Sequence, residues 1–471
     1  MNGREQATRL EICTIHQIGH GERHGRARDL FTVWFGTNIQ LLTIVTGGLA
    51  VSAFHLSLLW AIAGLTLGNL VGAIFMALHA AQGPRLGVPQ MVQTRGQFGS
   101  YGSLLVICIV IIMYVGFLAS NMVLGGEALA SLASGWSDGP GIVLIALFSV
   151  VATVYGHDLI HAYARIVTYV AGLVLALSFV WIIWVHGVPA DILTRNAFNL
   201  SGFLGAVSVA AIWQISYAPY VSDYSRYMPY ETGARPAFWA SYWGCTLGSL
   251  LPMILGALVA LAAPIGSLVH GLAVLTSGIA PLVLIVFSVA IAVSSAMNLY
   301  CGALSTLTVG QTLFASWLPG PRARTIATVS LISVAVSVAF LSKDSFLANY
   351  EGFVLLLLYV LIPWTAINLV DYYLLRRGEY DVAAFFREDG GIYGLINAPA
   401  VVCYVLGTAI QIPFVATHLY TGPIARAMGG IDLSWIVGLL VTSPAYYWLA
   451  RRSPAHQAGS IGAAAQVNAA P

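Results

Sequence analysis

The chain has 471 residues, of which 58% are hydrophobic and only 8% are charged. A soluble domain carries about a quarter charged residues, so this composition excludes a water-exposed globular surface and indicates an integral membrane protein. The near balance of 20 Lys and Arg against 18 Asp and Glu excludes the basic footprint of a nucleic-acid-binding protein.

Twelve apolar runs are each long enough to cross a hydrocarbon core of roughly 30 Å. All should be helices, because lipid offers no partner for the unpaired backbone groups of a strand edge. Their approximate bounds are 31–55, 58–82, 102–130, 140–156, 163–186, 199–221, 236–262, 281–311, 324–342, 350–370, 397–417 and 432–450.

The cationic residues indicate how these segments are oriented. If the N-terminus is cytoplasmic, 17 of the 20 Lys and Arg residues lie in cytoplasmic segments, and only Arg195, Lys343 and Arg426 lie outside. This positive-inside bias predicts a multi-pass protein of the cytoplasmic (inner) cell membrane with both termini in the cytoplasm. Residues 1–30 are polar and Arg-rich and predict no cleavable signal peptide.

Two of the twelve segments contain interruptions. The first carries Gly36-Thr37-Asn38 and Thr46-Gly47-Gly48, and the sixth carries Tyr217-Ala218-Pro219. Two broken helices five segments apart are typical of inverted-repeat transporters, whose substrate site lies at the membrane midplane beside unwound backbone. The expected organisation is a cytoplasmic segment at 1–30, five-helix repeats at 31–186 and 199–370, helices 11 and 12 at 397–450, and a cytoplasmic tail at 451–471.

Polar and aromatic residues near helix centres are the candidates for a ligand site, because they are costly in lipid. Amide side chains offer both donors and acceptors, and aromatic rings stack on flat ligands. Segments one, three, six and eight carry no charged side chain at their centres, so we expect an uncharged planar ligand rather than an ion. The alternative is that the amides and hydroxyls only hold helices together. The candidates are Thr37, Asn38, Gln40 and Thr43, then Phe117 and Asn121, then Trp213, Gln214 and Ser216, and finally Ser294, Ser295 and Asn298.

The coupling ion has two candidates, H⁺ and Na⁺. Ser294 and Ser295, facing the carbonyls of the broken first segment near Thr43, would supply oxygen ligands for Na⁺. Glu127, toward the outer end of segment three, is the alternative proton carrier, but its position near the membrane interface favours simple solvation. Asp223 and Arg226 stand at i and i+3 at the inner end of segment six, where we expect a gating role.

Other motifs point away from catalysis and metal binding. The chain has no HExxH and no P-loop, so we expect no enzyme. The five cysteines form no C-x-x-C pair, and His157, Asp158 and His161 are interpreted as solvated interface residues, so we expect no metal and no cofactor.

Four stretches resemble the nucleobase:cation symporter-1 family, the purine-cytosine permeases and their hydantoin, allantoin and thiamine relatives. They are FTVWFGTNIQLLTIVTGGLA (31–50), TRGQFGSYG (94–102), SYAPYVSDYSRYMP (216–229) and MNLYCGAL (297–304). The resemblance implies an all-α membrane protein with the LeuT-type fold, inverted five-helix repeats plus two helices. It also implies a planar substrate stacked between aromatic residues of helices three and six, with amides of helices three and eight reading its edge.

Carried over residue by residue, the resemblance assigns Phe117 and Asn121 to helix three, Trp213 or Gln214 to helix six and Asn298 to helix eight. Sodium-coupled members have hydroxyl residues a turn or more before that asparagine, whereas Ala292-Val293-Ser294-Ser295 stands here, which leaves H⁺ as an alternative. The expected function is import of an uncharged nucleobase, cytosine or purine, coupled to H⁺ or Na⁺ by alternating access. A hydantoin, allantoin or thiamine transporter, and a heterocycle-binding channel or sensor, are the alternatives; the oligomeric state is left open.

Overall fold

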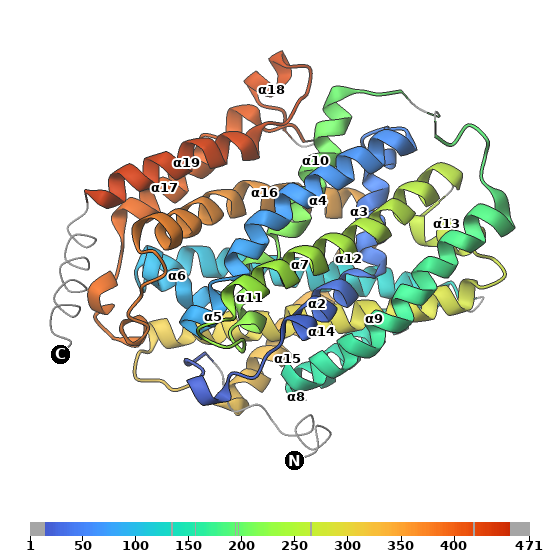
Figure 1. The fold of residues 1–471 in the computed structure, drawn as a ribbon. Helices are drawn as coiled ribbons and strands as arrows, with labels where there is room; N and C mark the ends of the chain where they lie inside the picture. The colour runs from blue at the N-terminus through green and yellow to red at the C-terminus, as the bar shows by residue number, and fades with distance from the viewer. Residues whose placement is uncertain are drawn as a thin grey trace.

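The computed structural model describes residues 15–132, 135–155, 157–193, 195, 197–263, 266–417 and 420–452, and it leaves the side chains of residues 155–162 undescribed. Cys13, residues 1–14 of the expected segment 1–30 and residues 453–471 of the expected tail therefore lie outside the described residues. The long helices form one bundle, and the first and last described residues lie toward the same end of it (Figure 1).

The first expected segment is a broken helix. Helix α2 (Ala27–Asn38) and helix α3 (Leu41–Ser52) meet at an angle of 60°. Ile39 and Gln40 leave the helical region of φ/ψ space, and Gln40 is extended, with φ −150° and ψ 167°. The break confirms the interruption expected just after Gly36-Thr37-Asn38, and it leaves buried backbone groups beside Ile39 and Gln40, which are 0% and 1% exposed, outside the regular helices.

The second interruption expected in this segment, at Thr46-Gly47-Gly48, is wrong. Helix α3 runs unbroken through these residues. A Cβ at Gly47 would overlap the carbonyl oxygen of Met253, and a Cβ at Gly256 would overlap that of Ile44. The two glycines therefore serve close packing of α3 on helix α12 (Ala234–Ala262) instead of unwinding the chain.

The sixth expected segment is interrupted more gently. Helix α10 (Leu200–Ile215) and helix α11 (Ala218–Ser225) are separated by Ser216 and Tyr217, and together they form one continuous apolar span. Pro219, which has no backbone N–H, lies in the first turn of α11, where that donor would be unpaired anyway. The interruption at Tyr217-Ala218-Pro219 is thus present, with a smaller change of direction than in the first segment.

Helices occupy every other expected segment. Seven helical stretches among the described residues are long and apolar enough to cross a membrane, or eight when α2 and α3 count as one span; one stretch contains both α15 and α16. The apolar stretches Asp138–Val154 and Ala398–Phe414, which contain most of α8 and all of α17, are shorter, at 10–17 residues. The bounds are α4 (Leu58–Ala80), α7 (Gly102–Ala130), α8 (Asp138–Tyr155), α9 (His157–Val180), α14 (Ala280–Leu313), α15 (Pro321–Ser342), α16 (Phe346–Leu369), α17 (Ala398–Ala409) and α19 (Ser434–Arg451).

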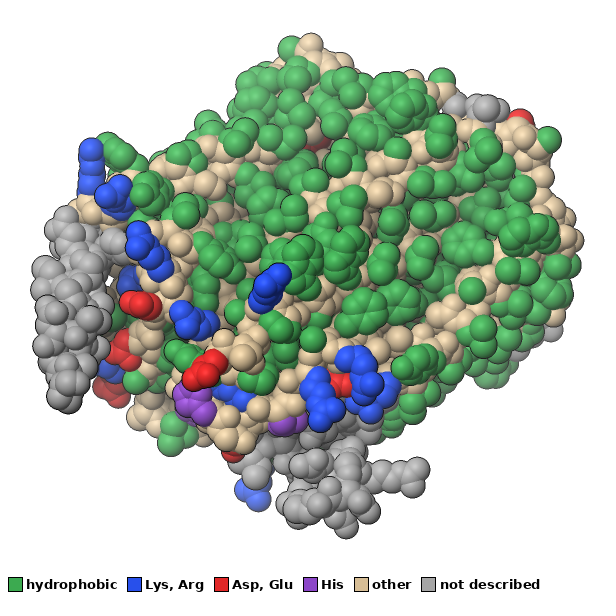
Figure 2. Space-filling view, in the orientation of Figure 1, with side chains coloured by type: hydrophobic (Ala, Val, Ile, Leu, Met, Phe, Trp, Pro, Cys, Tyr) green, Lys and Arg blue, Asp and Glu red, His purple; other side chains and the backbone are tan. Residues whose placement is uncertain are grey.

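The helices pack in two groups. Helix α12 lies against α2, α3 and α4, and α10 lies against α4, while α14 packs on α7, α8, α9 and α15. Large hydrophobic side chains such as Leu173, Trp184 and Leu341 are more than two-thirds exposed on the outside of the bundle. Figure 2 shows such side chains over most of one face, with Lys and Arg gathered in its left and lower parts. An apolar surface of this extent requires lipid around it.

The connection between α4 and α7 contains a short helix rather than the loop suggested for 94–102. Helix α6 (Gln90–Phe98) is anchored by Arg95, which is 2% exposed. Its Nη1 donates to the Phe385 carbonyl (2.9 Å), and its Nη2 donates to the Thr308 carbonyl (2.9 Å) and the Thr312 hydroxyl (2.6 Å). Arg95 thereby ties α6 to the last turns of α14.

Candidate functional site

The cavity beside the two helix breaks, here called the central cavity, is formed by α3, α7, α10, α11 and α14. Four predicted substrate ligands and one predicted cation ligand lie in its wall. Its volume is about 10 Å³, room for about one water molecule, so the walls are closed on one another in this structure. The lining residues are Gln40, Leu42, Phe117, Asn121, Trp213, Ser216, Tyr217, Tyr220, Ser294 and Asn298.

Two aromatic rings face each other across this cavity. The ring centroids of Phe117 and Trp213 are 6.1 Å apart, with planes at 87°. Phe353 of α16 covers Phe117 from the other side, at 5.3 Å and 77°. A flat ligand between parallel rings needs two van der Waals spacings of about 3.5 Å each. The rings must therefore turn and separate before they can enclose one.

Amide groups of the wall are buried without hydrogen-bond partners among the described residues. These are both the oxygen and the nitrogen of Asn121, the Oε1 of Gln40 and the Oδ1 of Asn298. The three side chains are 0%, 1% and 5% exposed. Leaving a buried polar group unpaired costs about 1–3 kcal/mol, so such atoms are expected where a ligand or water completes the pairing. Together they offer at least one donor and three acceptors toward the cavity.

Asn38 lies behind Trp213 and outside the cavity wall. Its Oδ1 accepts hydrogen bonds from Trp213 Nε1 (2.9 Å), the Tyr217 hydroxyl (2.7 Å) and the Ser249 hydroxyl (2.9 Å). Its Nδ2 donates to the Trp34 carbonyl (2.7 Å). With its amide engaged on both ends, Asn38 orients the Trp213 ring, and the structure does not bring it into contact with the cavity as a direct ligand.

Gln214 also points away from the cavity. Its Nε2 donates to Asn69 Oδ1 (2.6 Å) and to the Cys245 carbonyl (3.3 Å), and the side chain is fully buried. Neighbouring helix positions are about 100° apart around the axis, so Gln214 points to a different side of α10 from Trp213. Of the two residues that sequence comparison left open for helix six, Trp213 is the one in the wall.

Asn38 and Gln40 are both candidates from the first segment, and Gln40 is the amide that reaches the cavity. It precedes α3 at the helix break, and its Nε2 donates to the Ser294 hydroxyl (3.0 Å). The predicted cation ligands are thereby divided. Ser294 joins the cavity wall, whereas Ser295 and Thr43 are fully buried outside it, with hydroxyls that have no partner among the described residues.

The predicted gating residues lie below the central cavity on α11. Asp223 Oδ1 accepts a hydrogen bond from the backbone N–H of Gln90 (2.8 Å) at the start of α6. Arg226 Nη2 lies 3.4 Å from the hydroxyls of both Tyr227 and Tyr300. Asp223 is 2% exposed and Arg226 is fully buried. This end of α11 is therefore joined to two neighbouring elements by polar contacts.

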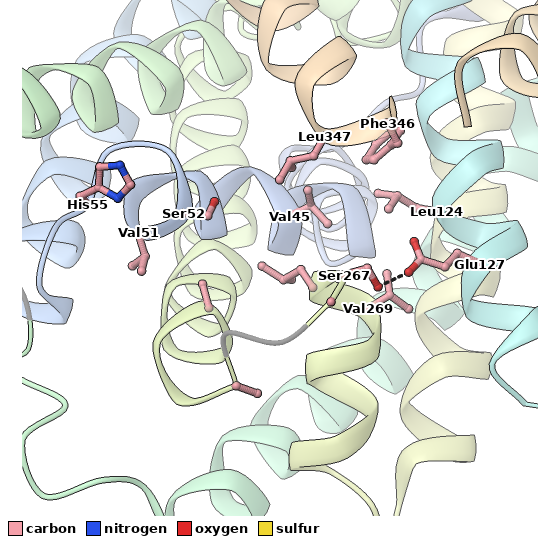
Figure 3. A pocket seen from close by; sticks show the side chains of 14 residues that line it. Val45, Val51, Ser52, His55, Leu124, Glu127, Ser267, Val269, Phe346 and Leu347 are labelled. Carbon is pink, nitrogen blue, oxygen red and sulfur yellow. Dashed lines mark hydrogen bonds between the residues drawn. The ribbon is translucent and has the colours of Figure 1, made fainter. Parts of the chain in front are cut away.

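A second, larger cavity, here called the vestibule cavity, lies farther along α3 and α7 (Figure 3). Its volume is about 320 Å³. Glu127 stands at one end and accepts a hydrogen bond from the Ser267 hydroxyl, which itself accepts one from the His270 backbone N–H (3.1 Å) at the start of helix α13 (Leu268–Leu275). The lining residues are Val45, Val51, Ser52, His55, Leu124, Glu127, Ala260, Ala263, Gly266, Ser267, Leu268, Val269, Phe346 and Leu347.

Only a thin layer separates the two cavities. Leu42 and Val45 on α3, like Asn121 and Leu124 on α7, are three residues apart and line different cavities, so the cavities are about one helical turn, ~5 Å, apart. The layer between them includes a hydrogen bond of 2.6 Å between the hydroxyls of Thr46 and Tyr350 of α16.

Two further features carry no site. Among the described residues, no group of three His, Cys, Asp or Glu side chains is placed to hold a metal ion, and the side chains of His157, Asp158 and His161 lie outside that description. Residues 135–139 read GWSDG, which matches the G-x-S-x-G pattern of serine hydrolases. That pattern works on a strand-to-helix turn, whereas here it precedes and enters α8 in a helix-to-helix connection.

Solved structures of membrane transporters share this architecture. Mhp1, a nucleobase-cation-symport-1 family transporter in a closed conformation with bromovinylhydantoin bound, matches with a TM-score of 0.74 and 18% identity, covering 94% of this chain and 96% of Mhp1. A Na⁺-coupled sialic acid symporter in a substrate-bound outward-open state matches with a TM-score of 0.64 and 15% identity, covering 92% and 91%. The protein is thus a multi-pass integral membrane protein with the LeuT-type fold, as expected from the sequence.

Sequence relatives identify the family. A protein-family sequence model, described as permease for cytosine/purines, uracil, thiamine, allantoin, matches residues 17–438. YxlA of Bacillus subtilis (strain 168), provisionally named a purine-cytosine permease, is 39% identical over 459 residues, 96% of this chain and 98% of YxlA. The purine-cytosine permease fcyB of Emericella nidulans is 24% identical over 440 residues, 89% of this chain and 84% of fcyB. The chain belongs to this permease family; it is a transporter and not an enzyme.

Proposed function

We propose that this permease is a secondary-active symporter that imports an uncharged nucleobase, cytosine or a purine, or a similar planar heterocycle, coupled to H⁺ or Na⁺ by alternating access. The observation that carries the proposal is the set of buried, unpaired amide atoms of Gln40, Asn121 and Asn298 beside two aromatic rings. Nucleobases present flat faces and mixed donor and acceptor edges, which such a wall matches.

The absence of charge from the central wall favours a neutral substrate. All ten lining residues are apolar, hydroxyl or amide side chains. A charged ligand in this buried place would lack a countercharge, and desolvation would penalise it. The purine-cytosine names of the relatives YxlA and fcyB agree with a neutral heterocycle.

The proposed roles follow the wall. Phe117 and Trp213 sandwich the ring, and Asn121, Asn298 and Gln40 read its edge. Asn38 and Gln214 act behind the wall, Asn38 by fixing the Trp213 indole and Gln214 by joining α10 to α4 and α12.

Alternating access is supported by unequal barriers on the two sides of the closed cavity. Toward the vestibule cavity, the barrier is about one helical turn thick. On the opposite side, Tyr220 and Tyr224 both contact the Trp34 ring, with centroids 6.1 and 5.8 Å away. Tyr224 also contacts Tyr300, at 6.1 Å, and the Tyr300 hydroxyl lies 3.4 Å from Arg226 Nη2. Opening toward the vestibule therefore disrupts fewer contacts. The group containing α2, α3, α4, α10, α11 and α12 is proposed to move against the group containing α7, α8, α14 and α15, with α9 and α16 as thin gates.

Coupling requires that ion binding favour the substrate-competent outward state. The buried hydroxyls of Ser295 and Thr43 keep Na⁺ in the proposal, because oxygen ligands without protein partners suit a hard cation. Glu127, at the vestibule cavity, is the corresponding proton site. Asp223 and Arg226 act in the proposed inner gate.

The proposed orientation places both termini in the cytoplasm, the repeats at 31–186 and 199–370, and helices 11 and 12 at 397–450. The gathering of Lys and Arg at the end of the molecule that carries the first and last described residues supports it (Figure 2). A C-terminal fluorescent-protein fusion is expected to fluoresce and a C-terminal alkaline-phosphatase fusion to be inactive; the reverse pattern would invert the orientation.

The function is tested by uptake of radiolabelled cytosine into liposomes containing the purified protein, with unlabelled adenine, hypoxanthine, uracil, allantoin and hydantoin as competitors. Saturable uptake with nucleobases as the strongest competitors is expected. Preference for allantoin or hydantoin would move the substrate to that branch of the family. Binding without uptake would indicate a sensor, and absence of any binding or competition would reject the proposal.

A further inference from the structure

We propose that the vestibule cavity is a second binding site for the transported heterocycle, which it occupies before entering the central cavity with its N–H edge on Glu127. This inference rests on the proposed function, because it assumes the same substrate and adds a second binding site on the path of that substrate. The proposed occupant is the incoming neutral heterocycle, and not a lipid or a peptide.

The sizes of the two cavities support this order. The vestibule cavity measures about 320 Å³, within the range of small-molecule pockets, whereas the central cavity measures about 10 Å³. In the closed conformation, a six-membered or fused ring fits only the vestibule. A molecule bound in the vestibule cavity lies about one helical turn from the wall of the central cavity.

The chemistry of the walls suits a flat ring with N–H donors. Figure 3 shows Val45, Phe346 and Leu347 on one stretch of the lining, with Glu127 and Ser267 at its end. These apolar side chains cover ring faces, while an ionised carboxylate accepts hydrogen bonds only. Hydrogen bonds to a charged acceptor are roughly twice as strong as neutral ones.

The Glu127 carboxylate is held in place by a directional chain of hydrogen bonds. Ser267 accepts the His270 backbone N–H, so its own hydroxyl proton is directed to Glu127 Oε1. A carboxylate offers about four lone-pair sites, and this contact uses one of them. Glu127 therefore presents an oriented acceptor to the cavity, and as the sole carboxylate among the lining residues it disfavours anionic heterocycles.

The consequence is a selection step remote from the central wall. Neutral heterocycles with N–H groups gain a contact at Glu127, and anionic heterocycles are repelled before they reach Phe117 and Trp213. Once the Thr46–Tyr350 contact opens, a bound ring moves about 5 Å along α3 and α7 to reach the amides.

Equilibrium binding tests the second site directly. Labelled cytosine and labelled adenine are titrated against purified wild-type protein, a Trp213→Ala/Asn298→Ala variant and the same variant with Glu127→Gln. Two classes of sites are expected in wild type, the weaker one alone in the double variant, and about a fivefold further loss of affinity when Glu127 is neutralised. Glu351→Gln, on α16 outside the cavity lining, is the matched control and should change nothing.

The outcomes separate this inference from the proposed function. If wild type binds one equivalent and the double variant binds none, the vestibule site is refuted while the nucleobase transporter stands. If wild type binds neither base and transports none of the panel, both fail.

A second measurement covers the case in which the double variant does not fold. Inhibition of labelled-cytosine binding by orotate, an anionic heterocycle, is compared among the wild-type protein and the single Glu127→Gln and Glu351→Gln variants. Glu127→Gln is expected to become about fivefold more sensitive to orotate, and equal sensitivity of all three proteins would overturn the proposal.

Discussion

Replacing Trp213 separates the role of its ring from the role of its N–H group. Trp213→Ala removes a ring that faces Phe117 in the central wall. Trp213→Phe keeps a ring and removes only the indole donor, which binds Asn38 Oδ1 at 2.9 Å and Ser249 Oγ at 3.0 Å. If Trp213 stacks on substrate, the two variants should differ strongly.

The magnitudes follow from the contacts. Stacking of a base on an aromatic side chain contributes about 1–3 kcal/mol, so Trp213→Ala should raise the half-saturating substrate concentration by roughly 5- to 150-fold and abolish uptake at low label concentration. Trp213→Phe loses one neutral hydrogen bond, about 0.5–1.5 kcal/mol, or roughly 2- to 13-fold. Asn298→Ala leaves a buried edge group of the substrate unpaired, at a cost of about 1–3 kcal/mol, so it should raise the half-saturating concentration by roughly 5- to 150-fold and also abolish uptake at low label concentration.

The assay is initial-rate uptake into liposomes over a range of substrate concentrations, with thermal stability measured in detergent. Trp435 supplies a matched control, because its indole N–H also donates to a serine, Ser208 Oγ at 3.0 Å, outside both cavities. Trp435→Ala and Trp435→Phe should transport normally. Unchanged kinetics in both Trp213→Ala and Asn298→Ala, with normal membrane insertion, would refute the placement of the site.

Three further predictions concern packing and gating. Gly256→Ala should prevent stable folding or lower the melting temperature markedly, because the added Cβ would overlap the backbone of α3. Gly172→Ala should be tolerated, because the atoms nearest its added Cβ are 3.9 Å away. Size-exclusion profiles and thermal unfolding compare the two variants. Arg95→Ala should lower the melting temperature, because three buried hydrogen bonds from a charged donor are lost, each worth about 1.5–3 kcal/mol. Arg387→Ala, which breaks an exposed ion pair, should leave the melting temperature unchanged. Equal effects of the two substitutions would contradict the anchoring role of Arg95. Tyr350→Phe should loosen the barrier by about 1 kcal/mol and speed labelling of a cysteine placed in the central wall about fivefold, and an unaltered labelling rate would exclude this contact from the gate.

The helices and the first break were predictable because they depend on local properties. Hydropathy identifies segments that must be helical in lipid, and all twelve expected segments contain a helix or a helix pair. The role of Gly47 was not predictable, because glycine permits both an unwound turn and close helix contact. Only the position of Met253 on α12, far away in sequence, decides between them.

The central wall was predicted in part. Phe117, Asn121 and Asn298 lie on regular helices, where spacing tells which residues share a face. Asn38 and Gln40 flank a break, where helical periodicity does not apply, so the extended backbone of Gln40 decides which amide reaches the cavity. The vestibule cavity depends on α13, an eight-residue helix too short to stand out as a membrane span.

Transport driven by an ion gradient is the central claim, and one measurement tests it most directly. The preferred base of the competition panel is supplied to liposomes containing the purified protein, with inward H⁺ and Na⁺ gradients imposed separately. Accumulation above the external concentration is predicted under one of the two gradients; dependence on Na⁺ would assign Ser294, Ser295 and Thr43 to the ion, and a pH gradient alone would assign them to packing. Equilibration to the external concentration regardless of either gradient would contradict symport and leave a channel.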